Sequence, residues 1–209
     1  MRIAVLLYPD FTTLDAVGPY EVLSRIPGAE VVFTAAGRGP VRNDLTSLAI
    51  TADAALDEVD SADLLLVPGG PGTEAQLADE AVLDWVRRID ATTTWTTSVC
   101  SGSLLLGAAG LLRGRRATSH WGVLDQLPRF GAEPTGSERI VVDGKYATSA
   151  GVSAGIDLAL TLTGLIAGDE TAQAIQLLIE YDPQPPYAAG SLAKASLEVV
   201  AGAHRLLQG

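Results

Sequence analysis

The chain has 209 residues, 47% of them hydrophobic but only 5% aromatic, and its formal net charge is −11 at pH 7. This length fits one domain, so we expect residues 1–209 to form a single α/β domain with a core of Leu, Val, Ile and Ala side chains. The negative charge opposes binding to nucleic acids and to anionic membranes, and we expect neither as a partner.

Three further features of the sequence predict a cytoplasmic location. The one cysteine cannot form an intramolecular disulfide. The first residues, MRIAVLLYPDF, lack the basic segment and long apolar core of a signal peptide. No apolar run reaches the roughly 18 residues that a membrane span requires.

The first part of the chain alternates apolar runs with helical patterns. Continuous apolar runs, typical of strands buried inside a parallel sheet, occupy 2–8, 29–37 and 62–72, and the third runs straight into a glycine-rich turn. Helical periodicity follows at 13–26 and near 74–89, and the polar stretch that extends to Thr51 is expected to hold short irregular strands.

The same alternation continues to the end of the chain. The pattern predicts a β-branched strand at 92–99, a helix at 101–112, a strand at 116–120, a hairpin at 139–150 that turns at Asp143-Gly144, and helices at 153–168, 169–181 and 191–207. Strands separated by helices predict a doubly wound, mostly parallel sheet, in which ligands bind outside the carboxyl ends of the strands.

Cys100 lies where a predicted strand meets a predicted helix, in the segment TSVCSGS. The small residues Ser98 and Gly102 around it match a nucleophile elbow, a strained turn that would leave the sulfur exposed. A thiol at a helix N-terminus is also expected to favour its thiolate form. Free cysteine is often a buried core residue instead, but the strand, turn and helix context favours a nucleophile.

Two other features follow predicted strands and are expected to lie near Cys100. The turn VPGGPG brings the backbone N–H groups of Gly69 and Gly70 close to the sulfur, where they and the N–H of Ser101 would bind developing negative charge, unless the turn is merely a tight connection. Asp15 fits a helix N-cap. Beside a thiolate, however, its carboxyl would hold a proton and act as a general acid.

His120 follows the strand predicted at 116–120 and points to two alternatives. It would pair with Cys100 as a catalytic base, or it would have a structural or pocket-lining role, which we favour because nothing in the sequence fixes its distance from the thiol. No group of His, Cys and carboxylate residues shows metal-ligand spacing, and no nucleotide-binding motif is present. We therefore expect neither a metal nor an organic cofactor.

Several segments together resemble the PfpI-type superfamily (ThiJ/PfpI, class I glutamine amidotransferase-like), over roughly residues 1–195. They are LDAVGP, VPGGPGT, TSVCSGSLLLGAAGLLRGRRATSHW, SAGVSAGIDLAL and the tail motif IEYDPQPPYAAGS. The resemblance implies a flavodoxin-like three-layer sandwich, a homodimer, Cys100 as the nucleophile on the elbow and Asp15 as its acidic partner. The residues expected to line the pocket for a small-molecule substrate are Trp121, Gly151 and Val152.

Within the superfamily the chain most resembles the isocyanide hydratase branch. Protease-like and chaperone-like members carry His directly after the nucleophile, where this chain has Ser101, and deglycase-like members carry Glu where it has Asp15. Isocyanide hydratases usually carry Thr after the cysteine, and Ser101 keeps that hydroxyl. The resemblance implies a hydro-lyase that converts an isocyanide and water to an N-substituted formamide through a covalent Cys100 thioimidate.

Two alternatives accompany this expectation. The first is a glyoxalase-like or deglycase-like cysteine enzyme that acts on reactive carbonyls. The second is a non-catalytic sensor, in which Cys100 is oxidised or a ligand binds, related to the ligand-binding half of AraC-type regulators. The chain shows no second, basic helix-turn-helix domain, so we do not expect a DNA-binding regulator.

Overall fold

The computed structural model describes residues 1–208, which divide into two compact units. The first unit comprises Met1–Ile179. The second begins at Glu180 and contains a proline-containing segment and one helix, α7 (Leu197–Gln208). The expectation of a single domain over 1–209 stays a prediction, and its last position lies outside the described residues.

The first unit is built on a seven-stranded sheet with the order β10-β11-β7-β6-β1-β2-β5. Neighbouring strands are parallel except for β10, which runs antiparallel to β11. The predicted mostly parallel sheet is therefore confirmed. Its strands are β1 (Arg2–Leu6), β2 (Glu30–Ala35), β5 (Ala54–Ala55), β6 (Leu64–Val67), β7 (Trp95–Ser98), β10 (Ile140–Asp143) and β11 (Tyr146–Ser149).

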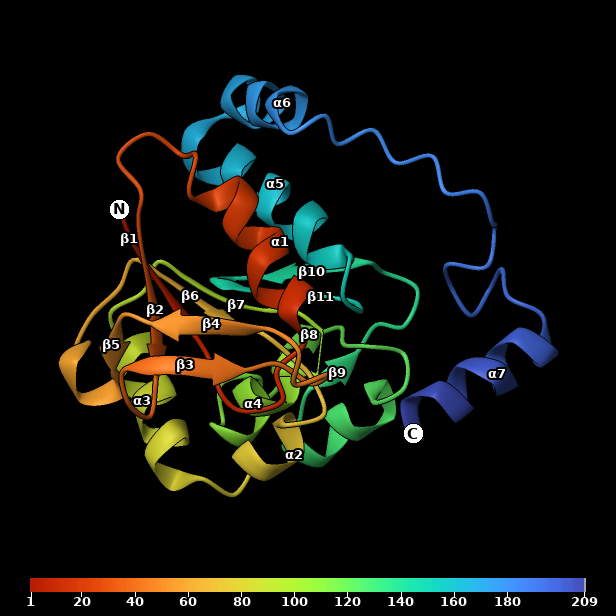
Figure 1. Cartoon of the computed structure of the whole chain (residues 1–209), viewed down its shortest axis with the longest axis horizontal. Helices are drawn as coiled ribbons and strands as arrows, with labels where there is room; N and C mark the ends of the chain where they lie inside the picture. The colour runs from red at the N-terminus through yellow and green to blue at the C-terminus, as the bar shows by residue number, and fades with distance from the viewer. Residues whose placement is uncertain (209) are drawn as a thin grey trace. The chain divides into compact units, whose positions relative to one another are not determined.

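Helices cover both faces of the sheet and complete three layers (Figure 1). On one face lie α1 (Thr13–Leu23), α5 (Ala154–Ala167) and α6 (Asp169–Leu178), and on the other α2 (Thr73–Gln76), α3 (Glu80–Asp90) and α4 (Gly102–Ala108). The connecting segments form two small two-stranded sheets, one of β3 (Gly39–Arg42) and β4 (Ala49–Ala52), the other of β8 (Arg116–Ala117) and β9 (Glu133–Pro134). They also contain the 3₁₀-helices η1 (Leu56–Glu58) and η2 (Leu124–Phe130). No helix in the described part of the chain is long and apolar enough to cross a membrane.

The strand order reverses between β1 and β6. From β1 the chain continues outward through β2 and β5, whereas from β6 it continues through β7 toward β11 in the opposite direction. Loops that follow β1, β6 and β7 consequently open at the same edge of the sheet, at the position where doubly wound folds bind their ligands. Both β1 and β6 are buried along nearly their whole length, which makes this edge a rigid support.

Several predicted helices are shorter in the structure than the sequence pattern indicated. The helices expected at 13–26 and 169–181 end at Leu23 and Leu178, and the one expected at 191–207 begins at Leu197. Two further differences have a clear local cause. The helix expected near 74–89 is divided into α2 and α3, because the Asp79 side chain accepts hydrogen bonds from the backbone N–H groups of Ala81 and Val82 and begins a new helix. The helix expected at 101–112 ends at Ala108, since Gly110 turns into the left-handed region with φ +84°.

The start of α4 packs directly against the end of β6 and tolerates only glycine. A Cβ atom at Gly102 would overlap the carbonyl oxygens of Val67 and Pro68, the second at 2.7 Å. We expect Gly102→Ala to lower the free energy of unfolding by about 3 kcal/mol or more, measured by urea denaturation, because backbone atoms must shift. Gly37→Ala is the matched control, since a Cβ at Gly37 meets nothing within 4 Å. Equal stability of the two variants would contradict this close contact.

Candidate active site

Cys100 occupies a strained turn between β7 and α4. Its φ is +95°, a left-handed conformation that costs a non-glycine residue about 1–3 kcal/mol. Three hydrogen bonds to its carbonyl oxygen hold the turn, from Ser119 Oγ at 2.7 Å, the His120 backbone N–H at 3.1 Å and Ser103 Oγ at 3.3 Å. The predicted nucleophile elbow is therefore present.

The Cys100 sulfur is less exposed than expected, and the pKa of its thiol is higher than expected. Only 5% of the residue is accessible, so the prediction of an exposed sulfur is wrong. Burial, followed by the charge of Asp15, raises the pKa of the thiol above its ordinary value, although backbone N–H groups of Val152 and Ser101 hydrogen-bond to the sulfur and lower it in part. Cys100 is thus mainly a thiol at neutral pH, not the expected thiolate.

Asp15 is fully buried in the first turn of α1. Thr12 is the N-cap residue of this helix, so the N-cap interpretation of Asp15 is wrong. Its Oδ2 accepts a hydrogen bond of 2.9 Å from the Gly69 N–H, and its Oδ1 is buried without a hydrogen-bond partner. Burial raises the pKa of the carboxyl from 3.8 to about 7, while the Gly69 N–H and the Cys100 thiol partly offset this rise.

The glycine turn orients side chains of the site instead of presenting free donors. The Gly69 N–H binds Asp15, and the Gly70 N–H donates to Ser101 Oγ at 2.9 Å. A side chain at Gly69 would lie 2.6 Å from the Ser101 backbone nitrogen, and one at Gly70, where φ is +141°, would lie 2.5 Å from the Asp10 oxygen. The N–H groups that reach the sulfur are those of Ser101 and Val152.

His120 is arranged as a neighbour of the site and not as a base. Its Nδ1 accepts a hydrogen bond of 3.1 Å from the Gly122 N–H, and burial lowers its pKa. The ring is therefore neutral at pH 7, with its proton on Nε2. It packs so closely on Gly151 that a Cβ there would overlap it, and the Trp121 ring lies beside it with 5.2 Å between ring centroids. These contacts favour the pocket-lining alternative.

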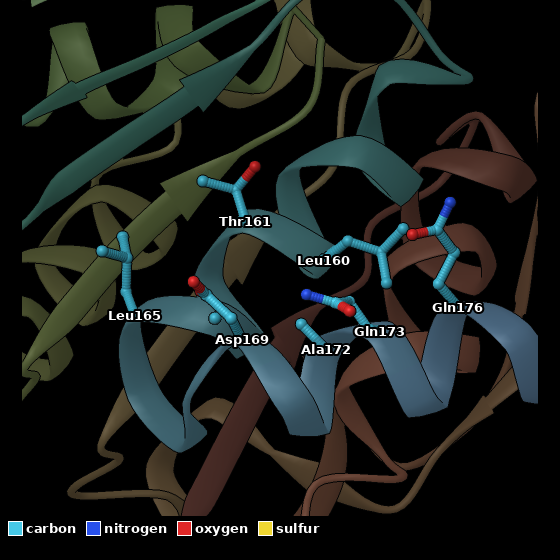
Figure 2. Close-up of a pocket in the computed structure, with 8 residues that line it drawn as sticks. Leu160, Thr161, Leu165, Asp169, Ala172, Gln173 and Gln176 are labelled. Atoms are coloured by element: carbon cyan, nitrogen blue, oxygen red, sulfur yellow. The ribbon is translucent and has the colours of Figure 1, made fainter.

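A separate hollow of about 380 Å³ lies between α5 and α6 (Figure 2). Its lining comes from the facing sides of these two helices and contains none of the residues that the sequence predicted for the site. The lining residues are Leu160, Thr161, Gly164, Leu165, Asp169, Ala172, Gln173 and Gln176.

The sequence reasoning missed two buried hydroxyl groups of the site, those of Tyr8 and Thr73. Tyr8 ends the apolar run that forms β1, and Thr73 is the first residue of α2, directly after the glycine turn. The signal that would have identified Tyr8 is a polar side chain at the carboxyl end of a buried strand, at the edge where ligands bind.

Comparison with known proteins gives three results. The sequence pattern of the DJ-1/PfpI family matches residues 1–164. An isonitrile hydratase of Pseudomonas putida is 42% identical over 200 residues, which cover 96% of this chain and 87% of that protein. A deglycase of Pyrococcus abyssi is 30% identical over 151 residues, which cover 71% of this chain and 89% of that protein.

Solved structures agree with the sequence comparison. The crystal structure of a ThiJ/PfpI family protein from Pseudomonas syringae superposes with a TM-score of 0.95 at 40% identity. The match covers 99% of this chain and 86% of the other. The flavodoxin-like three-layer fold expected from the sequence is thus confirmed.

The raised pKa of Asp15 predicts how stability changes with pH. Between pH 3.8 and about 7 the folded state holds a proton that the unfolded state releases, so stability falls as the pH rises through this range. Asp15→Asn cannot titrate. We expect its free energy of unfolding, minus that of the wild type, to increase from pH 4 to 7 by as much as ~4 kcal/mol and then level off. Urea denaturation from pH 4 to 8 measures this difference, and a pH-independent difference would refute the raised pKa.

Proposed function

The chain belongs to the DJ-1/PfpI family, and from that premise we propose that it adds water to isocyanides, also called isonitriles, and releases N-substituted formamides. The observation that carries the proposal is the pairing of a buried carboxyl, with a pKa of about 7, and the one thiol of the chain. The relationship to an isonitrile hydratase along nearly the whole chain supports a cysteine-dependent hydratase.

The pair formed by Cys100 and Asp15 holds one proton at mildly basic pH, above the pKa of Asp15. The pKa of Asp15 is about 7 and that of Cys100 lies above its ordinary value, so acid adds a second proton and strong base removes the first. The remaining proton resides on the sulfur or on the carboxyl. In the second arrangement, the N–H groups of Val152 and Ser101 stabilise the thiolate while Asp15 is a neutral acid.

The first step forms a covalent intermediate. The Cys100 thiolate attacks the terminal carbon of R–N≡C, and a carbon–sulfur bond forms as one π electron pair of the N≡C bond moves onto nitrogen, while the carbon keeps its lone pair. The Asp15 proton transfers to the same carbon. The product is the thioimidate R–N=CH–S–Cys100, and Asp15 is left ionised.

The second step uses water and restores the protein. Ionised Asp15 takes a proton from a water molecule, whose oxygen attacks the thioimidate carbon, and Asp15 passes this proton to the substrate nitrogen. Asp15 then takes the remaining proton of the new hydroxyl group as the carbonyl of the product forms. The carbon–sulfur bond then breaks, and R–NH–CHO leaves. The departing thiolate and the proton that Asp15 holds regenerate the one-proton pair, so every transfer is carried by Cys100, Asp15 and water.

The remaining site residues are proposed to bind and orient the substrate. Trp121, His120 and the segment Gly151–Val152 would line the pocket for the R group, and Ser101 would supply its backbone N–H. The expected homodimer and cytoplasmic location stay predictions. Light scattering of the purified protein tests the former, and a mass of one chain would contradict it.

Turnover of an isocyanide tests the proposal directly. Purified protein mixed with an alkyl or aryl isocyanide should produce many equivalents of formamide, followed by absorbance or NMR. We expect Cys100→Ala to abolish turnover and Asp15→Asn to lower kcat/KM by about 100-fold or more, because proton transfer is lost. Gly37→Ala should retain activity. A parallel assay with methylglyoxal covers the deglycase alternative, and consumption of this aldehyde without isocyanide turnover would overturn the proposal.

The pH dependence of kcat/KM provides a second test. The one-proton form of the pair becomes populated as the pH rises through the pKa of Asp15, so activity should increase with pH and reach a plateau above about 7. Initial rates at low isocyanide concentration between pH 5 and 9 give the profile. An acid limb near pH 4, the ordinary range of a carboxyl, would contradict control of the rate by an Asp15 carboxyl with a raised pKa.

A further inference from the structure

Three buried hydroxyl groups form a continuous hydrogen-bonded chain next to the site. Tyr8 Oη lies 3.0 Å from Thr73 Oγ1, which lies 2.8 Å from Ser101 Oγ. At one end the Gly70 N–H donates to Ser101 Oγ at 2.9 Å, and at the other Tyr8 Oη donates to the Pro68 carbonyl oxygen at 2.6 Å. Their residues are 2%, 3% and 9% exposed, which excludes most competition from solvent.

The two ends of this hydroxyl chain determine the direction of every hydrogen bond within it. A carbonyl oxygen only accepts, so the single hydroxyl hydrogen of Tyr8 points to Pro68, and Thr73 must donate to Tyr8. The hydrogen of Thr73 is then used, and Ser101 must donate to Thr73 at 2.8 Å, not to the Gly70 carbonyl at 3.3 Å. Ser101 Oγ remains free to accept from the Gly70 N–H, as observed.

The hydroxyl chain closes a ring around one peptide turn. It begins at the N–H of Gly70 and ends at the carbonyl of Pro68, the residues on either side of Gly69. Gly69 is the residue whose N–H binds Asp15 Oδ2. We propose that Tyr8 and Thr73 are positioning residues, which hold the 68–70 turn so that the Gly69 N–H keeps the Asp15 carboxyl oriented beside the Cys100 thiol.

The catalytic importance of this orientation rests on the proposed function. The effect of the hydroxyl chain on the pKa of Asp15 does not, and it can be tested separately. The hydrogen bond from the Gly69 N–H lowers the pKa of Asp15 and thereby offsets part of the rise that burial causes. The ionisable groups that face the Asp15 carboxyl are Cys100, Asp44 and Tyr8. Tyr8 stays neutral because burial raises its pKa, so its removal takes away no charge. A loosened turn would weaken the Gly69 hydrogen bond and move the pKa of Asp15 further up.

The same ring explains a requirement for a hydroxyl group at Ser101. Its oxygen accepts from the Gly70 N–H of the glycine turn, and its hydrogen is directed to Thr73 Oγ1. Ser101 thus contributes its side chain to the turn and its backbone N–H to the Cys100 sulfur. A purely structural role of Tyr8 and Thr73 would affect stability alone, whereas a positioning role also changes the protonation of Asp15.

Alkylation of Cys100 separates the two roles without any substrate. Because the chain has one cysteine, its rate of reaction with iodoacetamide as a function of pH reports when the pair loses its second proton. We expect the acid limb, near pH 7 in the wild type, to move up by roughly half to one pH unit in Tyr8→Phe and Thr73→Val. Thr73→Ser keeps the hydroxyl and should restore the wild-type limb. Tyr20→Phe, whose ring lies against Phe33, is the matched control.

The outcomes distinguish this inference from the proposed function. Unshifted limbs in both hydroxyl deletions, measured on variants with wild-type circular dichroism, would overturn the positioning role. If Tyr8→Phe does not fold, the pair Thr73→Val and Thr73→Ser decides, and equal limbs in these two variants would also overturn it. A shifted alkylation limb in a protein that hydrates no isocyanide would support the positioning role while refuting the hydratase. In an active hydratase, kcat/KM should follow the same shift.

Discussion

The burial of a carboxyl and a thiol in one small volume is the constraint on which the rest of the site depends. Neither charge is well solvated there, so burial raises the pKa of both Asp15 and Cys100, and the negative form of each disfavours that of the other. A pair of this kind retains one proton over a broad pH range. Near neutral pH, a separate cysteine would be a thiol and a separate aspartate would be ionised. The pair can instead present a thiolate nucleophile beside a protonated carboxyl.

The scaffold supports this pair through contacts that only very small groups permit. The left-handed turn at Cys100 is held by three donors to its carbonyl oxygen, and the turn opposite approaches so closely that Gly69 has no room for a Cβ atom. The strand order reverses between β1 and β6, which places the ends of β1, β6 and β7 at one edge. Strain and desolvation at the site are thus balanced by a rigid, fully packed sheet.

Stability and reactivity are opposed in this arrangement. Asp15 Oδ1 is buried without a partner, and ionisation of the carboxyl destabilises the folded state. An amide at the same position removes that cost together with the proton that the proposed chemistry transfers. The hydroxyl ring of Tyr8, Thr73 and Ser101 limits the cost, because it keeps one donor, the Gly69 N–H, directed at the other carboxyl oxygen.

Local sequence patterns determined the alternation of strands and helices, the elbow at Cys100, the glycine pair directly after a strand and the position of Asp15 at the start of the first helix, because periodicity and small-residue turns act over a few neighbours. Only the tertiary structure decided how these groups are used. The partner of Asp15 lies 54 residues away along the chain, and Thr73 lies 65 residues from Tyr8, so neither contact leaves a local signal. Burial, which made Cys100 a thiol and not the expected thiolate, likewise arises from all the elements that surround it.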